Sequence, residues 1–557
     1  MVLCHCLRSD QRDADRRPAR SPDEVAQSRG LCPRPGIHLL EGGLDAANLA
    51  GYRFVLLPAT AAGSGGRVVN VRAEPGSLVT RYQPFCRCVG LLCLLCLCPA
   101  LGRAQVASPG NAQSAGEATF RTDVPERAYD IILARPTRDS VTLAILAYQH
   151  LEGYVAYGTQ PGSDPTWTPV RTFPEGQPVE VVLTGLQSDT GYSYQFCFRV
   201  PTAAEFDMSP EYRFHTQRPP GSAYTFTITA DPHLDEQTTP ELYRQTMLNA
   251  LADRPDFHID LGDTFMTGKH PDTESAGKQY LAQRYYFGLL CHSAPLFLVL
   301  GNHDGETARE QDGTAGSTAV WANSIRKQYF PNPVPEGFYT GNDTPHPFAG
   351  RLQDYYAWEW GDALFVVLDP YWHSPRRRGR DDNWTPTLGS EQYRWLQRTL
   401  EGSDAKYRFV FIHQLVGGAD RDGRGGVEVA PLYEWGGGNA DGSDGLAAHR
   451  PGWPMSIHQL LVAHHVSAVF HGHDHLFAEQ HLDGILYQAV PQPGWGGRFD
   501  PRRAIEYGYT QGTILGSSGH LRVTVSDTQA AVEYIRSSLP SGQDQAASVA
   551  HRCSLVP

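Results

Sequence analysis

The sequence predicts an α/β catalytic region preceded by a small all-β sandwich. Between residues 226 and 470, short apolar runs alternate with helical stretches, which is typical of an α/β fold whose strands are buried on both faces. Between residues 128 and 217, runs of β-branched and aromatic residues are separated by turn residues, with no competing helical period. Two prolines and a glycine within residues 218–222 separate the two regions, because they continue neither a helix nor a strand ladder.

The all-β region is predicted to span residues 128–217. Its expected strands are Tyr129–Leu133, Val141–Leu146, Tyr154–Gly158, Val179–Leu183, Tyr192–Val200 and Tyr212–Thr216. The spacing of Leu186, Thr190 and Tyr192 resembles the tyrosine-corner segment of fibronectin type III domains, in which the phenol ties a strand crossover back to the backbone. We therefore expect a fibronectin-like sandwich, with a strand-rich part of one larger domain as the alternative.

The α/β region is predicted to span residues 222–537. Its expected strands are Phe226–Ala230, Phe257–Leu261, Leu296–Leu300, Leu364–Leu368, Phe409–Ile412 and Val466–Phe470. Helices are expected to begin at Thr239, which precedes a proline, and at Ser390. Leu521–Val525 and Ala530–Ile535 indicate a closing hairpin. The polar residues 538–557 are predicted to be a disordered tail.

Residues 79–104 have the pattern of a secretory signal. Arg81 and Arg87 supply positive charge, residues 88–98 form an apolar stretch too short to cross a bilayer, and cleavage is expected after Ala104. We therefore expect a secreted or periplasmic protein.

The chain ahead of this segment is expected to be leader rather than folded protein. Residues 1–104 form that leader, and residues 1–78 are a candidate for a mis-annotated start because a signal sequence normally begins the chain. Residues 105–127 are small and polar, as in a linker. No later apolar run is long enough for a transmembrane helix, so a stable membrane span is not expected.

Charge and cysteine usage exclude some classes of protein. The 557 residues carry a formal net charge of -13, which argues against nucleic acid as the main partner. A local cluster of arginines within residues 376–380 is either a solvated loop or an electrostatic lip for an anionic substrate. Only Cys197, Cys291 and Cys553 lie beyond residue 98, so the folded part is not a disulfide scaffold.

Five polar motifs carry the chemistry, and each follows a strand-like run. They are Asp231-Pro232-His233, Gly262-Asp263, Gly301-Asn302-His303-Asp304, His413 at the end of Val410-x-x-His413, and Gly472-His473-Asp474-His475. Residues just past the carboxyl ends of neighbouring strands converge on one crevice of an α/β sheet. Carboxylates, an amide and imidazoles without thiolate suit iron, zinc, manganese or similar ions. The motifs therefore predict a two-metal hydrolytic site.

The five motifs resemble those of the calcineurin-like metallophosphoesterase superfamily, and with the upstream sandwich the chain is similar to purple acid phosphatases over roughly residues 128–537. The resemblance implies a four-layer α/β/β/α sandwich and two metal ions, most simply Fe, Zn or Mn. It also implies the ligands: Asp231, His233 and His475 for the first ion, Asn302, His413 and His473 for the second, and Asp263 as the bridge.

The same resemblance implies a function. We expect hydrolysis of phosphate esters, first of all phosphomonoesters, by a metal-bridging hydroxide. His303 would contact the phosphoryl group or protonate the leaving oxygen, and Asp304 would fix the tautomer of His303. A phosphodiesterase or nucleotidase with the same site is one alternative. A binding or adhesion protein with an inactive phosphoesterase domain is another, and the sequence leaves the oligomeric state open.

Two residues depart from the purple acid phosphatase pattern. Those enzymes have a glycine in place of His233 and a coloured tyrosinate ligand in place of Met266, three residues beyond the bridging aspartate. We therefore expect the first metal to occupy a colourless, imidazole-ligated site.

Two further segments are candidates for shaping the pocket. Residues 416–454 are rich in glycine and aspartate and follow His413, so they are predicted to be a lid or substrate-selecting loop, with a flexible insertion as the alternative. Tyr371, Trp372 and His373 follow a predicted strand and are expected to line the pocket, or else to pack beneath that loop.

Overall fold

The computed structural model describes residues 119–159, 165–375, 383–420, 422–497, 500–539 and 546–557. All of them belong to one compact unit, Ala107–Pro557. The predicted signal segment, the first part of the linker and the arginine cluster at 376–380 lie outside the described residues. None of the helices in the described part of the chain combines the length and the apolar character that crossing a bilayer requires.

Two sheets build the predicted all-β region. Its strands are β1 Tyr129–Ala134, β2 Ser140–Ala147, β3 Leu151–Gly158, β4 Thr166–Trp167, β5 Arg171–Phe173, β6 Val179–Thr184, β7 Gly191–Arg199, β8 Asp207–Met208 and β9 Tyr212–His215. One sheet has the order β1-β2-β6, and the other the order β4-β3-β7-β8, with β5 on β3 and β9 on β7. The backbone N–H of Gln187 donates to the Tyr192 hydroxyl at 2.8 Å. The phenol thus makes the backbone contact that the sequence predicts, whereas the fibronectin-like assignment stays a prediction.

Two larger sheets form the catalytic region. The strands are β10 Tyr224–Thr229, β11 Phe257–Asp260, β12 Leu296–Leu298, β13 Thr340–Gly341, β14 Tyr356–Trp360, β15 Ala363–Val367, β16 Tyr407–Ile412, β17 Ala468–His471, β18 Leu476–Leu482, β19 Ile485–Ala489, β20 Thr513–Gly516, β21 Gly519–Val525, β22 Ala530–Ser537 and β23 Ala547–Leu555. The six-stranded sheet has the order β12-β11-β10-β21-β22-β23, and the eight-stranded sheet the order β13-β14-β15-β16-β17-β19-β18-β20.

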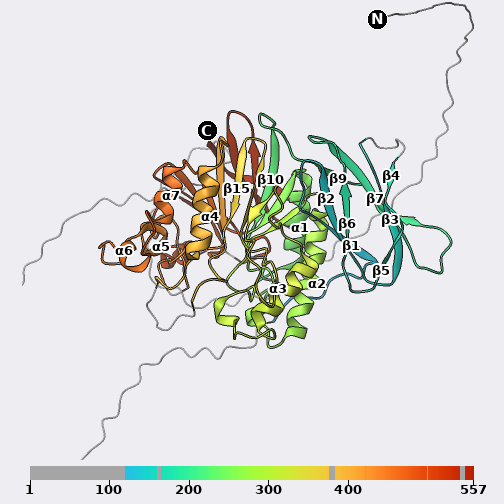
Figure 1. The fold of residues 1–557 in the computed structure, drawn as a ribbon, viewed down its shortest axis with the longest axis horizontal. Helices are drawn as coiled ribbons and strands as arrows, with labels where there is room; N and C mark the ends of the chain where they lie inside the picture. The colour runs from blue at the N-terminus through green and yellow to red at the C-terminus, as the bar shows by residue number, and fades with distance from the viewer. Residues whose placement is uncertain (1–118, 160–164, 376–382, 421, 498–499, 540–545) are drawn as a thin grey trace, which may run out of the picture. The chain divides into compact units, whose positions relative to one another are not determined.

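The helices of the catalytic region lie on the outer faces of these sheets. They are α1 Pro240–Ala252, α2 Thr273–Cys291, α3 Thr318–Tyr329, α4 Gly389–Glu401, α5 Tyr433–Gly436, α6 Leu446–His449, α7 Ile457–Ala463 and α8 Pro501–Glu506, with short 3-10 turns η1 Thr267–Lys269 and η2 Ala308–Glu310. In Figure 1, α1, α2 and α3 (green) lie on one side of the sheets, and α4 and α7 (orange) on the other.

Three apolar cores explain this layering. Alternate residues of the two large sheets, such as Phe226 and Phe409, are buried against each other between the sheets. Tyr243 of α1 and Phe287 of α2 pack on the other face of the six-stranded sheet. Leu396 of α4 belongs to a third core on the outer face of the eight-stranded sheet. The strands are thus buried on both faces, and the predicted four-layer α/β/β/α sandwich is confirmed.

Most predicted elements are present, with ends shifted by one to three residues. α1 begins after Thr239 as expected, whereas α4 begins at Gly389 with Leu388 at the N-cap. The hairpin predicted near residues 521–535 is formed by β21 and β22. The described part of the predicted linker, residues 119–127, has no helix or strand and contacts the catalytic region through Arg121, whose N–H donates to the Leu234 carbonyl at 2.6 Å.

The prediction of a disordered tail at 538–557 is wrong for the last residues. β23 pairs antiparallel with β22, with one register shift between Tyr534 and Ile535, and forms the edge of the six-stranded sheet. Arg552 also forms an ion pair with the buried Glu533 of β22. The polar composition that indicated disorder belongs to an edge strand, which needs apolar side chains on one face only.

Candidate metal centre

The five sequence motifs meet at one edge of the paired sheets. β10, β11 and β12 are parallel neighbours, and so are β15, β16 and β17, so their carboxyl ends lie together within each sheet. The six-stranded sheet supplies Asp231 and His233 after β10, Asp263 after β11 and Asn302 after β12. The eight-stranded sheet supplies His413 after β16, and His473 and His475 after β17.

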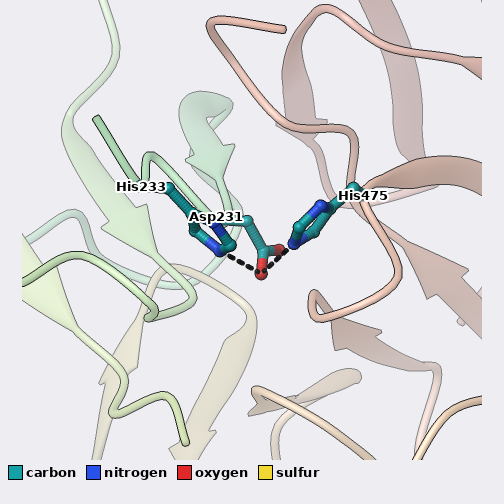
Figure 2. A group of neighbouring side chains, drawn as sticks. All are labelled: Asp231, His233 and His475. Atoms are coloured by element: carbon teal, nitrogen blue, oxygen red, sulfur yellow. Dashed lines mark ion pairs between the residues drawn. The ribbon is translucent and has the colours of Figure 1, made fainter. Parts of the chain in front are cut away.

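The first cluster consists of Asp231, His233 and His475, with ligand atoms that all lie within 4.8 Å of one another. Oδ1 of Asp231 is 3.7 Å from Nε2 of His233 and 3.4 Å from Nε2 of His475, and Figure 2 shows both rings turned toward this carboxylate. Among the described residues, Oδ1 of Asp231 and Nε2 of His233 are buried without a hydrogen-bond partner. Buried polar atoms of this kind require a partner, so the cluster fits a bound cation.

The second cluster consists of Asp263, His413 and His473, again with ligand atoms within 4.8 Å. Nε2 of His413 is 3.2 Å from Nδ1 of His473 and 3.1 Å from Oδ1 of Asn302. The predicted amide ligand Asn302 therefore lies at the second cluster. All seven predicted ligands are gathered at the two clusters, which fits a metal better than a set of unrelated surface residues.

Asp263 joins the two clusters. Its Oδ2 lies 3.5 Å from Nε2 of His233 and 3.4 Å from Nε2 of His413, so one carboxylate oxygen faces an imidazole from each cluster. Its Oδ1 accepts a hydrogen bond from the backbone N–H of His303 at 2.8 Å. This is the arrangement that a bridging carboxylate between two ions requires.

Neighbouring groups fix which nitrogen of each ring faces the centre. Nδ1 of His233 lies 3.0 Å from Oδ2 of Asp235, and Nδ1 of His413 lies 2.8 Å from the Leu261 carbonyl. Nε2 of His473 lies 2.8 Å from the Asp422 carbonyl. The outward nitrogen therefore donates, and the inward nitrogen keeps a lone pair for a metal.

The clusters keep their carboxylates ionised. Burial raises the pKa of Asp231, but the imidazoles of His475, His233 and His413 outweigh it and hold that pKa well below its ordinary value. Burial lowers the pKa of His413, while Asp263 and Asp231 raise it to about 9. These opposite shifts show how strongly the carboxylates attract positive charge, which bound metal ions would supply in place of protons.

The backbone turns sharply at the ligands. Asp231, Asp263, His473 and His475 have φ values of 59°, 54°, 71° and 55°. Residues other than glycine adopt this left-handed region at a cost, and such strain is typical of functional sites. A side chain at Gly301 could not be accommodated, because its Cβ would lie 2.1 Å from the backbone nitrogen of Asp263.

The role predicted for Asp304 is wrong. Its carboxylate is buried and accepts hydrogen bonds from the backbone N–H groups of Asp263, Thr264, Phe265 and Gly301 at 2.7–3.1 Å. None of its hydrogen bonds within the described residues reaches the ring of His303. Asp304 therefore holds the turn that carries the bridging aspartate, and it does not set the tautomer of the neighbouring histidine.

His303 lies where the sequence places it, beside the centre but outside the two clusters. Its ring centroid is 6.3 Å from that of His233, and its side chain is partly exposed. Burial, together with the cations of Lys269, His233 and His413, lowers the pKa of His303 to about 4, although Asp263 acts against this. The imidazole is therefore neutral near pH 7 and has one N–H to donate.

Two glutamines of α2, which the sequence did not single out, fix the ligand-bearing loops. Nε2 of Gln279 donates to the carbonyls of His233 at 2.6 Å and Thr264 at 3.0 Å. Nε2 of Gln283 donates to the carbonyls of Pro232 at 2.7 Å and Thr264 at 2.8 Å. Both side chains are fully buried. α2 thus ties the loop after β10 to the loop after β11.

The segment 416–454 is not a structureless insertion. It contains α5 and α6, and Val416, Val427 and Trp435 are buried in the core beneath the eight-stranded sheet. Its Asp422 carbonyl faces His473, so the segment also borders the centre. The flexible alternative is therefore wrong for its described residues. Its role in selecting substrates stays a prediction. Deletion of residues 419–445 would expose part of the core that contains Val427 and Trp435.

Of the three residues expected to line the pocket, Tyr371 lies at the centre. Its ring centroid is 6.2 Å from that of His413, and its hydroxyl donates to Oε1 of Gln414 at 3.0 Å. Trp372 instead packs in a small core with α3, and His373 lies 3.5 Å from Oδ2 of Asp354. These two side chains have packing and ion-pair roles, because the chain turns directly after Tyr371.

Comparisons with known proteins agree with this geometry. The model of the calcineurin-like phosphoesterase family matches residues 224–477. The chain carries a calcineurin-like phosphoesterase domain. With the ligand clusters at its strand ends, it is a metal-dependent phosphoesterase. The match spans the five motifs from Asp231 to His475, which confirms the predicted superfamily. A comparison with curated proteins finds none that matches the sequence.

Two solved structures that match this chain differ in how closely they follow it. A structure described as PhoD is 17% identical with a TM-score of 0.54, covering 76% of this chain and 89% of that one. The purple acid phosphatase PPD1 from yellow lupin seeds is 16% identical with a TM-score of 0.49, covering 73% of this chain and 71% of that one. At such low identities, the likeness to PhoD shows the fold alone.

Proposed function

We propose that the protein hydrolyses phosphate esters, first of all phosphomonoesters, at a centre of two metal ions. The observation that carries the proposal is the position of Asp263, whose Oδ2 lies within 3.5 Å of an imidazole nitrogen from each cluster. Asp231, His233 and His475 would hold the first ion, and Asn302, His413 and His473 the second. The donor set of carboxylates, imidazoles and an amide suits Fe, Zn or Mn.

The protein's own residues prepare the site for this reaction. When bound, two such ions lower the pKa of a shared water and neutralise charge on the phosphoryl oxygens. Asp304 holds the turn of Asp263, so the bridge does not reorganise during the reaction. The buried ring of Tyr371 lies edge-on to the ring of His413 on one side of the site.

His303 is proposed to contact the phosphoryl group or to give a proton to the leaving oxygen. The hydrogen bond between its backbone N–H and Asp263 fixes its place beside the bridge. The low pKa of its ring favours the contact role near neutral pH, because a neutral imidazole donates a hydrogen bond without losing its proton. A proton donor would give activity that falls as the ring loses its proton with rising pH, whereas a contact would not.

One assay tests the proposal against its alternatives. Purified protein, loaded separately with Fe, Zn and Mn, is offered p-nitrophenyl phosphate and bis-p-nitrophenyl phosphate alongside Asp263→Asn. We expect release of p-nitrophenol from the monoester by the wild type and none by the variant. Preference for the diester would favour the phosphodiesterase alternative. Equal inactivity of both proteins with every metal would favour a binding or adhesion protein with an inactive domain.

The colour of the loaded protein tests the ligand set of the first ion. Because His233 lies in the first cluster, we propose a colourless imidazole-ligated site. A strong visible absorption band in metal-replete protein would contradict this.

Export of the protein is a separate proposal. It is supported by the signal-like pattern of residues 79–104. N-terminal sequencing of protein recovered outside the cytosol is expected to begin just after Ala104, and a mature chain that retains residues before 79 would contradict it.

A further inference from the structure

Strand β1 of the all-β region packs against the catalytic region with its outer face. Ile131 and Leu133 are buried in the core of the β-sandwich, whereas Ile132 between them is buried in the core formed by α1 and α2. Asp130 lies on the same face as Ile132, because side chains alternate along a strand. A Cβ at Gly288 of α2 would already be in contact with the Cβ of Asp130, at 3.4 Å. β1 and α2 therefore approach each other closely.

A buried ion pair joins this face of β1 to α2. Oδ1 of Asp130 lies 2.6 Å from Nε and 2.5 Å from Nη2 of Arg284, whose side chain is fully buried. The same guanidinium donates to the carbonyl of Ala144 in β2 at 2.9 Å, and to the carbonyl of Tyr329 at the end of α3. Oδ2 of Asp130 accepts the Tyr148 hydroxyl at 2.6 Å. One arginine thus binds α2 to two strands of the sandwich.

The glutamines that hold the ligand-bearing loops lie beside this arginine on α2. Gln283 directly precedes Arg284, and Gln279 lies one turn earlier. The Tyr243 hydroxyl donates to Oε1 of Gln283 at 3.0 Å, and Nε2 of His270 lies 2.7 Å from Oε1 of Gln279. The amide nitrogens donate to the loops after β10 and β11. Since both ends of each amide have partners, the position and rotation of α2 decide where these donors meet the loops.

The two ions depend unequally on α2. The loops that α2 holds supply Asp231, His233 and the bridge Asp263. The imidazoles of the second cluster, His413 and His473, follow β16 and β17 of the eight-stranded sheet. Within the described residues, the glutamine side chains of α2 donate only to the first two loops. A shift of α2 should therefore disturb the first ion more than the second.

We propose that the β-sandwich supports the first metal position through α2. Asp130 fixes Arg284 and with it the position of α2, and α2 fixes the loops that carry the ligands of the first ion and the bridge. Asp130 and Arg284 are positioning residues, because they act on the ligands through the helix. The inference rests on the two-ion centre of the proposed function and on no particular substrate.

Replacement of Asp130 tests this support through metal affinity. Asp130→Asn keeps the shape of the side chain and removes the charge. Chelator competition, at a temperature at which the metal-free form is folded, is expected to show the first ion bound about 5-fold or more weakly and the second unchanged. His475→Ala and His473→Ala, which each remove a ligand of one ion, identify the two binding steps. Equal weakening of both ions would overturn the proposal.

A double variant guards against misfolding. Among the described residues, Asp130 is the only acidic partner of Arg284, so Asp130→Asn leaves a buried charge unpaired. Asp130→Asn combined with Arg284→Met removes both charges and leaves no unpaired charge in the interior. The same selective weakening of the first ion is expected from this variant.

Asp256→Asn is the matched control at the opposite end of the strands. Asp256 also pairs with an arginine, because Nε and Nη2 of Arg218 lie 2.7 and 2.9 Å from its two carboxylate oxygens. It precedes β11, whereas the metal centre lies past the carboxyl end of that strand. We expect this variant to lower the melting temperature without changing either metal affinity. Equal weakening of the first ion in Asp256→Asn and Asp130→Asn would overturn the proposal, since loss of stability alone would then explain it.

Hydrogen exchange in the wild type tests the same link from the opposite direction. Because coupling between two sites is reciprocal, metal loading is expected to slow amide exchange in β1 more than in β3, which lies in the other sheet of the sandwich. A wild type that binds two ions without slower exchange in β1, or a folded Asp130→Asn that binds both ions as tightly as the wild type, would overturn the support by the sandwich and leave the two-ion centre standing. A wild type that binds fewer than two ions would overturn the centre itself.

Discussion

The six-stranded and the eight-stranded sheet contribute different chemistry to the metal centre. The six-stranded sheet supplies both carboxylates and the amide, and the turn of Asp263 is held by backbone hydrogen bonds to Asp304. The eight-stranded sheet supplies imidazoles only, and their rings are oriented by carbonyl groups such as those of Leu261 and Asp422. Each cluster nevertheless takes ligands from both sheets. Metal binding should therefore link the two sheets as well as form the reactive site.

The largest effect is expected from Asp304→Ala, which removes the carboxylate that holds the turn of the bridging residue Asp263. Four backbone N–H groups would lose their acceptor, at a cost of roughly 3 kcal/mol or more in the free energy of unfolding. We expect hydrolysis to fall below detection and both ions to be lost. Urea unfolding and metal analysis measure these changes. Retention of both ions at wild-type stability would show that Asp304 has no such role.

Removal of the metals tests whether the ions link the sheets. An ion at 100 times its dissociation constant stabilises the folded state by about 2.7 kcal/mol, provided that the unfolded chain does not bind it. Chelation should therefore lower the melting temperature, and metal replacement should restore it. His413→Ala is the matched variant, because it removes a ligand from the eight-stranded sheet. Equal melting temperatures of the metal-free and the metal-loaded protein would contradict the proposal that the ions link the two sheets.

His303→Ala separates chemistry from metal binding. His303 lies outside both clusters, so we expect turnover to fall by roughly 10² or more while metal content persists. Loss of metal from this variant would place His303 among the ligands instead.

The smallest effect is expected from Asp235→Asn, which alters a partner of a ligand rather than the ligand. Asp235 orients His233 of the first cluster, and loss of such partners typically costs about 10- to 100-fold in metal affinity. Competition with a chelator should show weaker binding of the first ion and unchanged binding of the second. Equal weakening of both ions would contradict the assignment of His233 to the first cluster alone.

The sequence predicts the ligands better than it predicts what supports them. Asp231, Asp263 and His413 follow short apolar runs that predict buried strands, so their convergence follows from the geometry of parallel strands. The support from Asp304 was misassigned because adjacency to His303 does not reveal that the chain turns between them. The Asp422 carbonyl could not be predicted, since a backbone group leaves no pattern in the sequence.

The same contrast holds for the fold. The predicted strands of the two-sheet core are apolar runs, and β10, β11, β12, β15, β16, β17, β21 and β22 lie within a few residues of their predicted positions. The strands β13, β14, β18, β19 and β20 were not predicted. β23 was missed because an edge strand needs only one apolar face, and its residues 547–555 mix small, polar and charged side chains. The core residues of 416–454, such as Val427 and Trp435, are separated by many glycines, so no helical or strand period shows that they are buried.

The most direct test of the two-ion centre is the metal content of the purified protein and of Asp263→Asn, measured by elemental analysis per folded chain. Two ions per chain in the wild type, with loss of metal in the variant, are expected from a carboxylate whose oxygen faces an imidazole of each cluster. A wild-type chain that binds one ion or none under saturating metal, or a variant that binds both as tightly as the wild type, would contradict the bridge.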